Sequence, residues 1–341
     1  MSLLALLRKQ NRKTLFTTPS HGQKFFVFHK LRQFYKYDIS ETDAHDPQTA
    51  LLKAENRASK IYETKHTHFL TNGSTSGIIT AVLTCTKPND KVLIWRNAHP
   101  SHLNAVKLAG CEPVFYDLPV KKGWGVPDKT TADLIDVKGI KAVIVTSPSY
   151  EGIVSDIIGL KSVCEKNNAY LIVDEAHGAL YPFSDKLPQS AVKIADFTIQ
   201  SLHKTAGGLN PTALLHVNCD LDAAKSLSMI NTTSPSYPLL ASIEANINYL
   251  NSKRGRKNLD TLIENIKTLK KSVSNIEFGG DDVTKILIKK DGVSGFELSE
   301  KLFDEFDIED EKTNEISTML LCGIGTDEKK LKRLKHALLR Q

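Results

Sequence analysis

Residues 200–205, Gln-Ser-Leu-His-Lys-Thr, place a hydroxyl, an imidazole and an amine within one short stretch. They follow an apolar run over residues 194–199 and precede Gly207-Gly208. This pattern predicts a strand that ends in a turn, at the carboxyl edge of a sheet, where open α/β folds bind ligands. We interpret Lys204 as a lysine that forms a Schiff base with a carbonyl compound. For any single lysine of a basic chain, a solvated surface position is the alternative.

A carboxylate and two imidazoles follow other apolar runs. Asp174 comes directly after Tyr-Leu-Ile-Val, and a buried carboxylate requires a cation or a hydrogen-bond donor as its partner. A protonated pyridine nitrogen is one such partner, and a helix N-terminus or a buried arginine is another. His99 and His177 lie at similar strand ends. Histidines there are commonly structural, but two of them beside a lysine and an aspartate indicate a functional site.

Residues 72–77, Asn-Gly-Ser-Thr-Ser-Gly, form a hydroxyl-rich turn before an apolar helix expected over Ile78–Cys85. Free backbone N–H groups and the positive end of the helix dipole would meet there, as they do in a phosphate site. An N-capped helix after an ordinary loop is the alternative. The turn matches neither the dinucleotide fingerprint nor the Walker loop.

Short apolar runs alternate with helical segments through the middle of the chain. Nearly continuous apolar strands separated by helices predict an α/β fold with a mainly parallel sheet covered on both faces. Polar residues follow several of these strand ends, as a ligand crevice requires. The expected strands are Val92–Trp95, Pro113–Tyr116, Ala142–Val145, Tyr170–Val173, Phe197–Ile199 and Ala213–Val217, with helices over Ser101–Ala109 and Ile158–Asn167.

The chain is expected to divide into three parts. Residues 1–46 form an N-terminal arm, and residues 47–237 form the large domain that carries the site. Residues 238–341 begin with a long linking helix and continue as a smaller α+β domain.

Composition excludes several classes of protein. The chain has 341 residues, a net charge of +6 with interspersed charges, and five scattered cysteines without metal-ligand spacing. These features predict neither a nucleic-acid-binding protein nor a disulfide-stabilised one, and no metal site. The short apolar N-terminus followed by basic residues is neither a signal peptide nor a membrane span, so we expect a cytoplasmic protein with no membrane partner.

Several short motifs occur along about residues 18–245. They are Thr-Pro-Ser-His at 18–21, Asn-Gly-Ser-Thr at 72–75, Arg-Asn-Ala-His-Pro-Ser at 96–101, Ser-Pro-Ser-Tyr-Glu-Gly at 147–152, Asp-Glu-Ala-His-Gly-Ala at 174–179, Gln-Ser-Leu-His-Lys-Thr at 200–205 and Thr-Thr-Ser-Pro-Ser-Tyr at 232–237. Together, and in this order, they resemble the motifs of the ornithine, lysine and arginine decarboxylases, the group III, fold-type I enzymes that use pyridoxal 5'-phosphate.

The resemblance implies a role for each matching residue. Lys204 would form the Schiff base with the cofactor, Asp174 would pair with its pyridinium nitrogen, and His99 would stack on its ring. Ala176 would pack beneath the ring, with His177 near its edge. The phosphate would be held by Ser74, Thr75, Ser201 and His203, and by Thr233 or Ser234 of a second subunit. The family further implies a homodimer with active sites at the subunit interface.

The implied function is decarboxylation of lysine, ornithine or arginine to carbon dioxide and a polyamine-type amine. The distal cation of such a substrate requires a carboxylate, for which Asp43, Asp46 and Glu244 are candidates. An aminotransferase, a Cα–Cβ lyase and a non-catalytic regulatory relative remain alternatives. The chain resembles a short form without the family's long C-terminal region, and it departs from the motifs at Ser20, Pro100, Ser147 and Glu151. These departures bear on the choice of substrate.

Overall fold

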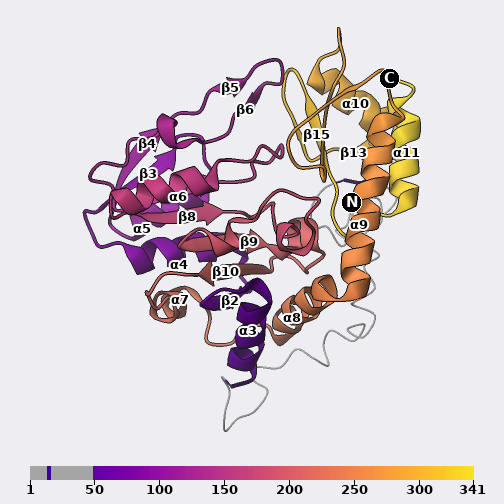
Figure 1. The fold of residues 1–341 in the computed structure, drawn as a ribbon. Helices are drawn as coiled ribbons and strands as arrows, with labels where there is room; N and C mark the ends of the chain where they lie inside the picture. The colour runs from indigo at the N-terminus through magenta and orange to yellow at the C-terminus, as the bar shows by residue number, and fades with distance from the viewer. Residues whose placement is uncertain (1–13, 17–48) are drawn as a thin grey trace, which may run out of the picture.

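A seven-stranded sheet forms the centre of the large domain in the computed structural model, which describes residues 14–16 and 49–341 (Figure 1). All neighbouring pairs from β9 to β4 are parallel, whereas β10 runs antiparallel to both β9 and β2. The mainly parallel sheet predicted from the sequence is therefore present. In spatial order the strands are β2 (His66–Leu70), β10 (Ala213–Val217), β9 (Phe197–Ser201), β8 (Tyr170–Asp174), β7 (Ala142–Thr146), β3 (Lys91–Trp95) and β4 (Glu112–Tyr116).

Helices cover both faces of this sheet because its strands are apolar on both sides. In β7, Ile144 packs in one cluster with α4 (Gly73–Cys85) and α5 (Pro100–Leu108), together with α7 (Ala224–Ile230). Its neighbours Val143 and Val145 pack on the opposite face with α6 (Ile157–Lys166). This alternation is the period-two pattern of a strand buried on both faces.

The helix α4 begins at Gly73, five residues before the expected start at Ile78. The sequence analysis assigned Gly73 to Gly77 to a loop because their hydroxyl groups hide the helical pattern. In the structure, Ser76 Oγ donates to the Gly73 carbonyl at 2.7 Å, and Gly73 N donates to the Pro211 carbonyl at 2.8 Å. The hydroxyl-rich residues are thus the first turn of the helix itself.

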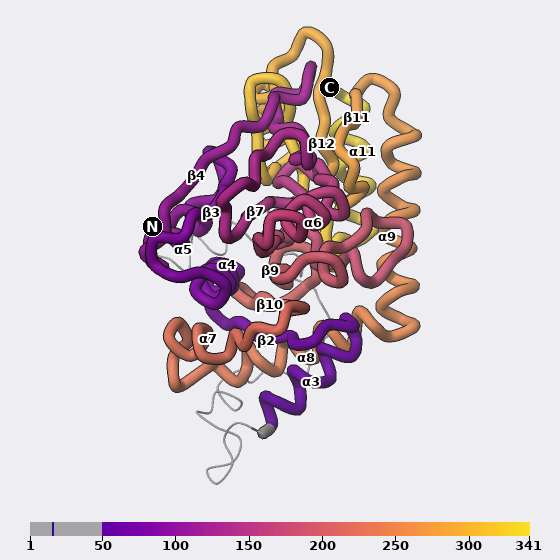
Figure 2. Tube along the Cα trace, turned by 60° about the vertical axis from the view of Figure 1, so that its left-hand side comes forward, coloured from indigo at the N-terminus to yellow at the C-terminus, as the bar shows by residue number. Residues whose placement is uncertain are grey.

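Two long helices lead from the large sheet to the smaller domain. The helix α8 (Tyr237–Asn251) packs against α3 (Thr49–Tyr62) and β2, and α9 (Lys253–Lys271) then runs along the small domain beside α11 (Glu328–Leu338). Figures 1 and 2 show α9 along the outer side of that domain in both views.

The small domain contains an antiparallel four-stranded sheet and a buried cluster shared with α9, α10 (Gly295–Phe306) and α11. Its strands are, in spatial order, β11 (Glu277–Gly279), β12 (Lys285–Lys289), β15 (Thr318–Leu321) and β14 (Lys312–Thr313). A short strand near the start of the chain, β1 (Thr14–Leu15), pairs in parallel with β13 (Ile308–Glu309), and Phe16 is buried in the same cluster. A further hairpin of the large domain consists of β5 (Val120–Lys121) and β6 (Val126–Pro127). Among the described residues, no helix combines the length and the apolar character needed to span a membrane.

Candidate active site

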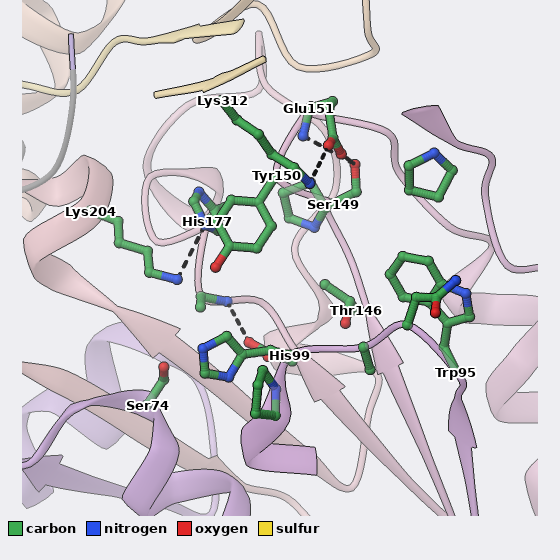
Figure 3. Close-up of a pocket in the computed structure, with 17 residues that line it drawn as sticks. Ser74, Trp95, His99, Thr146, Ser149, Tyr150, Glu151, His177, Lys204 and Lys312 are labelled. Carbon is green, nitrogen blue, oxygen red and sulfur yellow. Dashed lines mark hydrogen bonds and ion pairs between the residues drawn. The ribbon is translucent and has the colours of Figure 1, made fainter. Parts of the chain in front are cut away.

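A cavity of about 260 Å³ opens at the carboxyl ends of the parallel strands (Figure 3). The loops after β3, β7 and β8 supply most of its wall, and the small domain contributes a lysine from β14. This is the edge at which the sequence predicts a site. The lining residues are Ser74, Trp95, Asn97, Ala98, His99, Pro100, Pro127, Thr146, Pro148, Ser149, Tyr150, Glu151, Asp174, Ala176, His177, Lys204 and Lys312.

Lys204 lies on a single turn of π-helix, Leu202–Ala206, directly after β9. Gly207 ends this turn at φ +89°, a left-handed conformation that favours glycine. The Lys204 amine lies 3.1 Å from Nε2 of His177 and 5.4 Å from the centroid of the Tyr150 ring. Burial lowers the pKa of Lys204, so its amine is neutral, and therefore nucleophilic, more often than that of a surface lysine.

Asp174 is the last residue of β8 and is buried. Its Oδ2 atom lies 2.9 Å from Nε2 of His102, and its Oδ1 atom accepts a hydrogen bond of 3.1 Å from the backbone N–H of Ala176. Burial by itself would raise the pKa of Asp174, but the hydrogen bond and charge of His102 and the charge of Lys204 outweigh it and hold the pKa below its ordinary value. The carboxylate therefore stays ionised in a buried position.

His102 was missed by the sequence analysis, which considered only a pyridine nitrogen, a helix N-terminus or an arginine as partners of Asp174. Its signal was present, since His102 lies one helical turn after His99 and would share its helix face. His99 itself is the N-cap of α5 and lines the cavity, and its Nδ1 atom accepts a hydrogen bond of 3.2 Å from the backbone N–H of Ser101. This bond fixes the orientation of the imidazole beside Asp174 and Lys204.

The four residues of this chain that are expected to bind the phosphate differ in their exposure and in whether they line the cavity. Ser74, on the first turn of α4, lines the cavity, and Ser201 is fully buried at the end of β9 with an Oγ atom that has no hydrogen-bond partner among the described residues. His203 is half-buried, and its Nδ1 atom lies 3.1 Å from the Thr212 carbonyl. Thr75 is exposed and does not line the cavity.

Thr233 and Ser234 lie in the exposed segment between α7 and α8 and do not line the cavity of their own chain. Ser234 N donates to Thr232 Oγ1 within that segment. Their expected role is assigned to a second subunit, so the geometry of a single chain does not bear on it.

A close contact brings the N-terminal turn of α4 to the ends of β9 and β2. A Cβ atom on Gly77 would lie 2.8 Å from Leu70 Cδ1 and 3.0 Å from Ile199 Cγ2, so only glycine allows this approach. As a result, the N-terminal turn of α4, which carries Ser74, packs beside β9, which ends at Ser201. The N–H groups of a helix N-terminus, together with hydroxyl groups, are donors that suit a phosphate group.

The remaining groups also fit pyridoxal phosphate. Lys204 offers an amine of lowered pKa, Asp174 offers an ionised carboxylate, and the Ser201 hydroxyl has no hydrogen-bond partner in the described part of the chain. The cofactor requires an amine for attachment, an acceptor for its ring N–H and donors for its phosphate. The described residues supply each of these.

Of the three carboxylates expected to bind a distal substrate cation, the structure describes only Glu244, which does not line the cavity. Glu244 accepts a hydrogen bond of 3.2 Å from Nε of Arg57 and lines a separate apolar depression between α3 and α8. Asp43 and Asp46 lie outside the described residues. The cavity contains Glu151, Tyr150 and Lys312. The sequence analysis noted Glu151 only as a departure from the family motif and assigned no role to Tyr150 or Lys312.

Comparisons with known proteins identify a family that this chain matches. A model of the family described as Orn/Lys/Arg decarboxylase, major domain, matches residues 9–286. The uncharacterized protein YaaO of Bacillus subtilis (strain 168) is 29% identical over 94% of this chain and 73% of its own length. An arginine decarboxylase of Halalkalibacterium halodurans is 27% identical over 87% of this chain and 65% of its own length.

Among solved structures, the constitutive lysine decarboxylase of Escherichia coli superposes with a TM-score of 0.78 at 20% identity, over 99% of this chain and 59% of that one. This likeness confirms the expected fold-type I architecture. The chain spans less than two thirds of the length of both named decarboxylases.

Proposed function

Because the chain belongs to the Orn/Lys/Arg decarboxylase family, we propose that it removes the α-carboxylate of a basic amino acid with pyridoxal phosphate as its cofactor. The family membership confirms the resemblance seen in the motifs and, with it, the expected cofactor. One observation carries the proposal for this chain, namely that the half-buried Lys204 and the buried carboxylate of Asp174 line one cavity. The expected products are carbon dioxide and an amine of the polyamine type.

When bound, pyridoxal phosphate accepts the electron pair left at the substrate Cα after a bond at that carbon breaks. Lys204 is the residue that would hold the cofactor covalently. Asp174, kept ionised by His102, would accept the hydrogen bond from the ring nitrogen and keep the proton on that atom. His99 would pack on the ring, with Ala176 beneath it and His177 near its edge.

The phosphate would be bound by Ser74, Ser201, His203 and the N-terminus of α4, with Thr75 contributing from its exposed position. His177 Nε2 lies 3.1 Å from the Lys204 amine. It is therefore placed to orient that amine through a hydrogen bond. Burial and the neighbouring charges of Lys204 and Lys285 keep the pKa of His177 well below its ordinary value, so the imidazole stays neutral and accepts a hydrogen bond.

Among the residues that the structure describes, the cavity lining offers no clamp for the α-carboxylate, which favours decarboxylation over transamination. An aminotransferase requires an arginine that holds the α-carboxylate, whereas a decarboxylase must leave this group free. No arginine is found among the described residues that line the cavity. Arg256 and Arg333 instead donate to backbone carbonyls elsewhere, those of Phe183 and Phe306.

The assembly and location are part of the same proposal. We infer a cytoplasmic homodimer in which Thr233 or Ser234 of one subunit completes the phosphate site of the other. No nucleic-acid partner or membrane partner is proposed. The molar mass measured by light scattering should correspond to two chains, and a monomer with full activity would contradict this arrangement.

A substrate panel tests the reaction. The holoenzyme is incubated separately with lysine, ornithine and arginine, and carbon dioxide is measured together with keto acid. Release of carbon dioxide from one of them supports the proposal. Keto acid without carbon dioxide would assign the chain to the aminotransferases, and a protein that takes up no cofactor would be the non-catalytic relative.

A further inference from the structure

Glu151 presents a buried carboxylate to the cavity, and it already binds a cation. Its side chain is only 5% exposed, and its Oε1 atom lies 2.7 Å from the Lys312 amine. The hydroxyl of Ser149 donates to Oε2 at 2.9 Å. Because a buried carboxylate without a partner is unfavourable, this site needs a positive charge.

An aromatic face completes the site. The Lys312 amine lies 4.8 Å from the centroid of the Tyr150 ring, within the range of a cation–π contact. The ammonium group is thus held between the Glu151 carboxylate and the Tyr150 ring (Figure 3). A carboxylate beside an aromatic face is a suitable receptor for an alkylammonium or a guanidinium group.

The carboxylate is rigidly positioned, whereas its cation is not. The turn that carries Tyr150 and Glu151 is anchored by the Gly152 carbonyl, which accepts hydrogen bonds from the backbone N–H groups of Asp281 at 2.9 Å and Asp282 at 3.1 Å. Lys312, by contrast, is 47% exposed and reaches the site from β14 of the small domain on a long, flexible side chain. An exposed lysine gains little from an ion pair and is easily exchanged.

We propose that Glu151 and Tyr150 bind the distal cation of the substrate, and that Lys312 is a resident cation which the substrate displaces. This inference rests on the proposed function, because it names the group that selects a basic amino acid at the same site. Lys204 marks the reacting end of the cavity, and its amine lies 5.4 Å from the ring centroid of the same Tyr150. A substrate that reaches from Lys204 to Glu151 along this ring therefore needs an amine or guanidine at the end of a short methylene chain.

Direct binding of diamines tests the proposal without turnover. The holoenzyme is titrated calorimetrically with 1,4-diaminobutane and 1,5-diaminopentane. Glu151→Gln should weaken binding by about tenfold or more, because the amide removes the charge but keeps the shape and the acceptor of the Ser149 bond. Lys312→Met should strengthen binding by about threefold or more, because the competing cation is gone.

The matched control is Glu315→Gln, which makes the same change of charge on an exposed residue outside the cavity. Its diamine affinity should equal that of the unaltered protein. Cofactor absorbance and thermal unfolding are recorded for every variant, so that a loss of fold is separated from a loss of the site. If Glu151→Gln folds normally and binds diamines as tightly as before, the proposal is wrong.

The Lys312→Met variant tests the main alternative, in which Lys312 binds the α-carboxylate of the substrate. If Lys312→Met weakens the binding of basic and neutral amino acids equally, Lys312 binds the α-carboxylate and the proposal is overturned. Failure of the proposed reaction has a different signature, since diamine binding that depends on Glu151 would persist even if no amino acid released carbon dioxide. Conversely, carbon dioxide release with unchanged KM in Glu151→Gln would leave the reaction intact and remove the cation site.

Discussion

The amine of Lys204 lies 3.1 Å from Nε2 of His177, and burial lowers the pKa of both side chains. Two cationic groups at this distance would repel one another, so the pair is stable only when at least one of them is neutral. Because His177 is the neutral partner, the uncharged form of Lys204 is favoured by the burial of its own side chain. This is the state that a lysine needs in order to attach to a carbonyl carbon.

Replacement of Lys204 by alanine should abolish cofactor attachment. We expect the absorbance band of the bound cofactor near the visible edge to disappear, together with all carbon dioxide release. Lys270→Ala is the control, because burial also lowers the pKa of Lys270 although it lies outside the cavity. A stable visible band in Lys204→Ala would show that another residue holds the cofactor.

Loss of the Asp174 charge should reduce the reaction rate strongly while leaving the fold intact. Asp174→Asn keeps the shape but cannot hold a proton on the cofactor ring, and we expect kcat to fall by about 100- to 1,000-fold, as for other preorganised charges. His102→Asn should have a smaller effect in the same direction, because it removes only the partner at 2.9 Å. Equal kcat values for Asp174→Asn and the unaltered enzyme would exclude the proposed role.

A buried ion pair joins the small domain to the loop that carries His177. Lys285 and Asp282 are fully buried, with Nζ 2.9 Å from Oδ2, and the Lys285 amine also donates to the His177 carbonyl at 3.0 Å. Lys285→Met leaves an unpaired buried carboxylate, so the free energy of unfolding should fall by about 3–5 kcal/mol. Urea unfolding measures this change.

The double variant Lys285→Met with Asp282→Asn provides the control for that prediction. It removes both charges, and the amide oxygen can still accept the hydrogen bond that the Tyr181 hydroxyl donates to Asp282 at 2.9 Å. We expect it to recover part of the lost stability. If the double variant is less stable than Lys285→Met, the loss in the single variant does not arise from the unpaired carboxylate.

His216 should make stability depend on pH in a defined direction. Burial lowers its pKa from 6.5 to about 3, while its ring nitrogens contact Thr67 Oγ1 at 2.9 Å and Gln200 Oε1 at 3.3 Å. Between these two pH values the unfolded chain binds the proton and the folded chain does not. The contribution of His216 to stability is therefore lost as the pH falls from 6.5 towards 3.

His216→Gln isolates this contribution because it removes the titrating group and keeps polar contacts. The stability of the unaltered protein relative to the variant should decrease by about 1.4 kcal/mol for each pH unit within that window. Urea unfolding at several pH values measures the difference. A difference that stays constant with pH would show that His216 does not titrate between the two states.

The local patterns in the sequence predicted much of the large domain correctly. Each expected strand of the sheet is present within one or two residues, because a strand buried on both faces is a short apolar run bounded by polar residues. The same reasoning placed the N-terminus of α4 too late, at Ile78 instead of Gly73. The first turn of that helix consists of glycine and hydroxyl residues, of which Ser74 lines the cavity, so it lacks the apolar period on which the prediction relied.

The sequence by itself determined the strand ends and the residue types that follow them, and the structure places Lys204, Asp174, His99 and Ser74 at one cavity. Only the tertiary structure decided which distant groups meet. His102 reaches Asp174 across 72 residues, and Lys285 reaches the His177 carbonyl across 108. Glu151 and Lys312 come from different domains and meet only because the small domain packs over the sheet edge. Strand patterns in the sequence reflect local burial. Contacts between residues far apart in the chain depend on how whole domains pack, and no local sequence pattern encodes this packing.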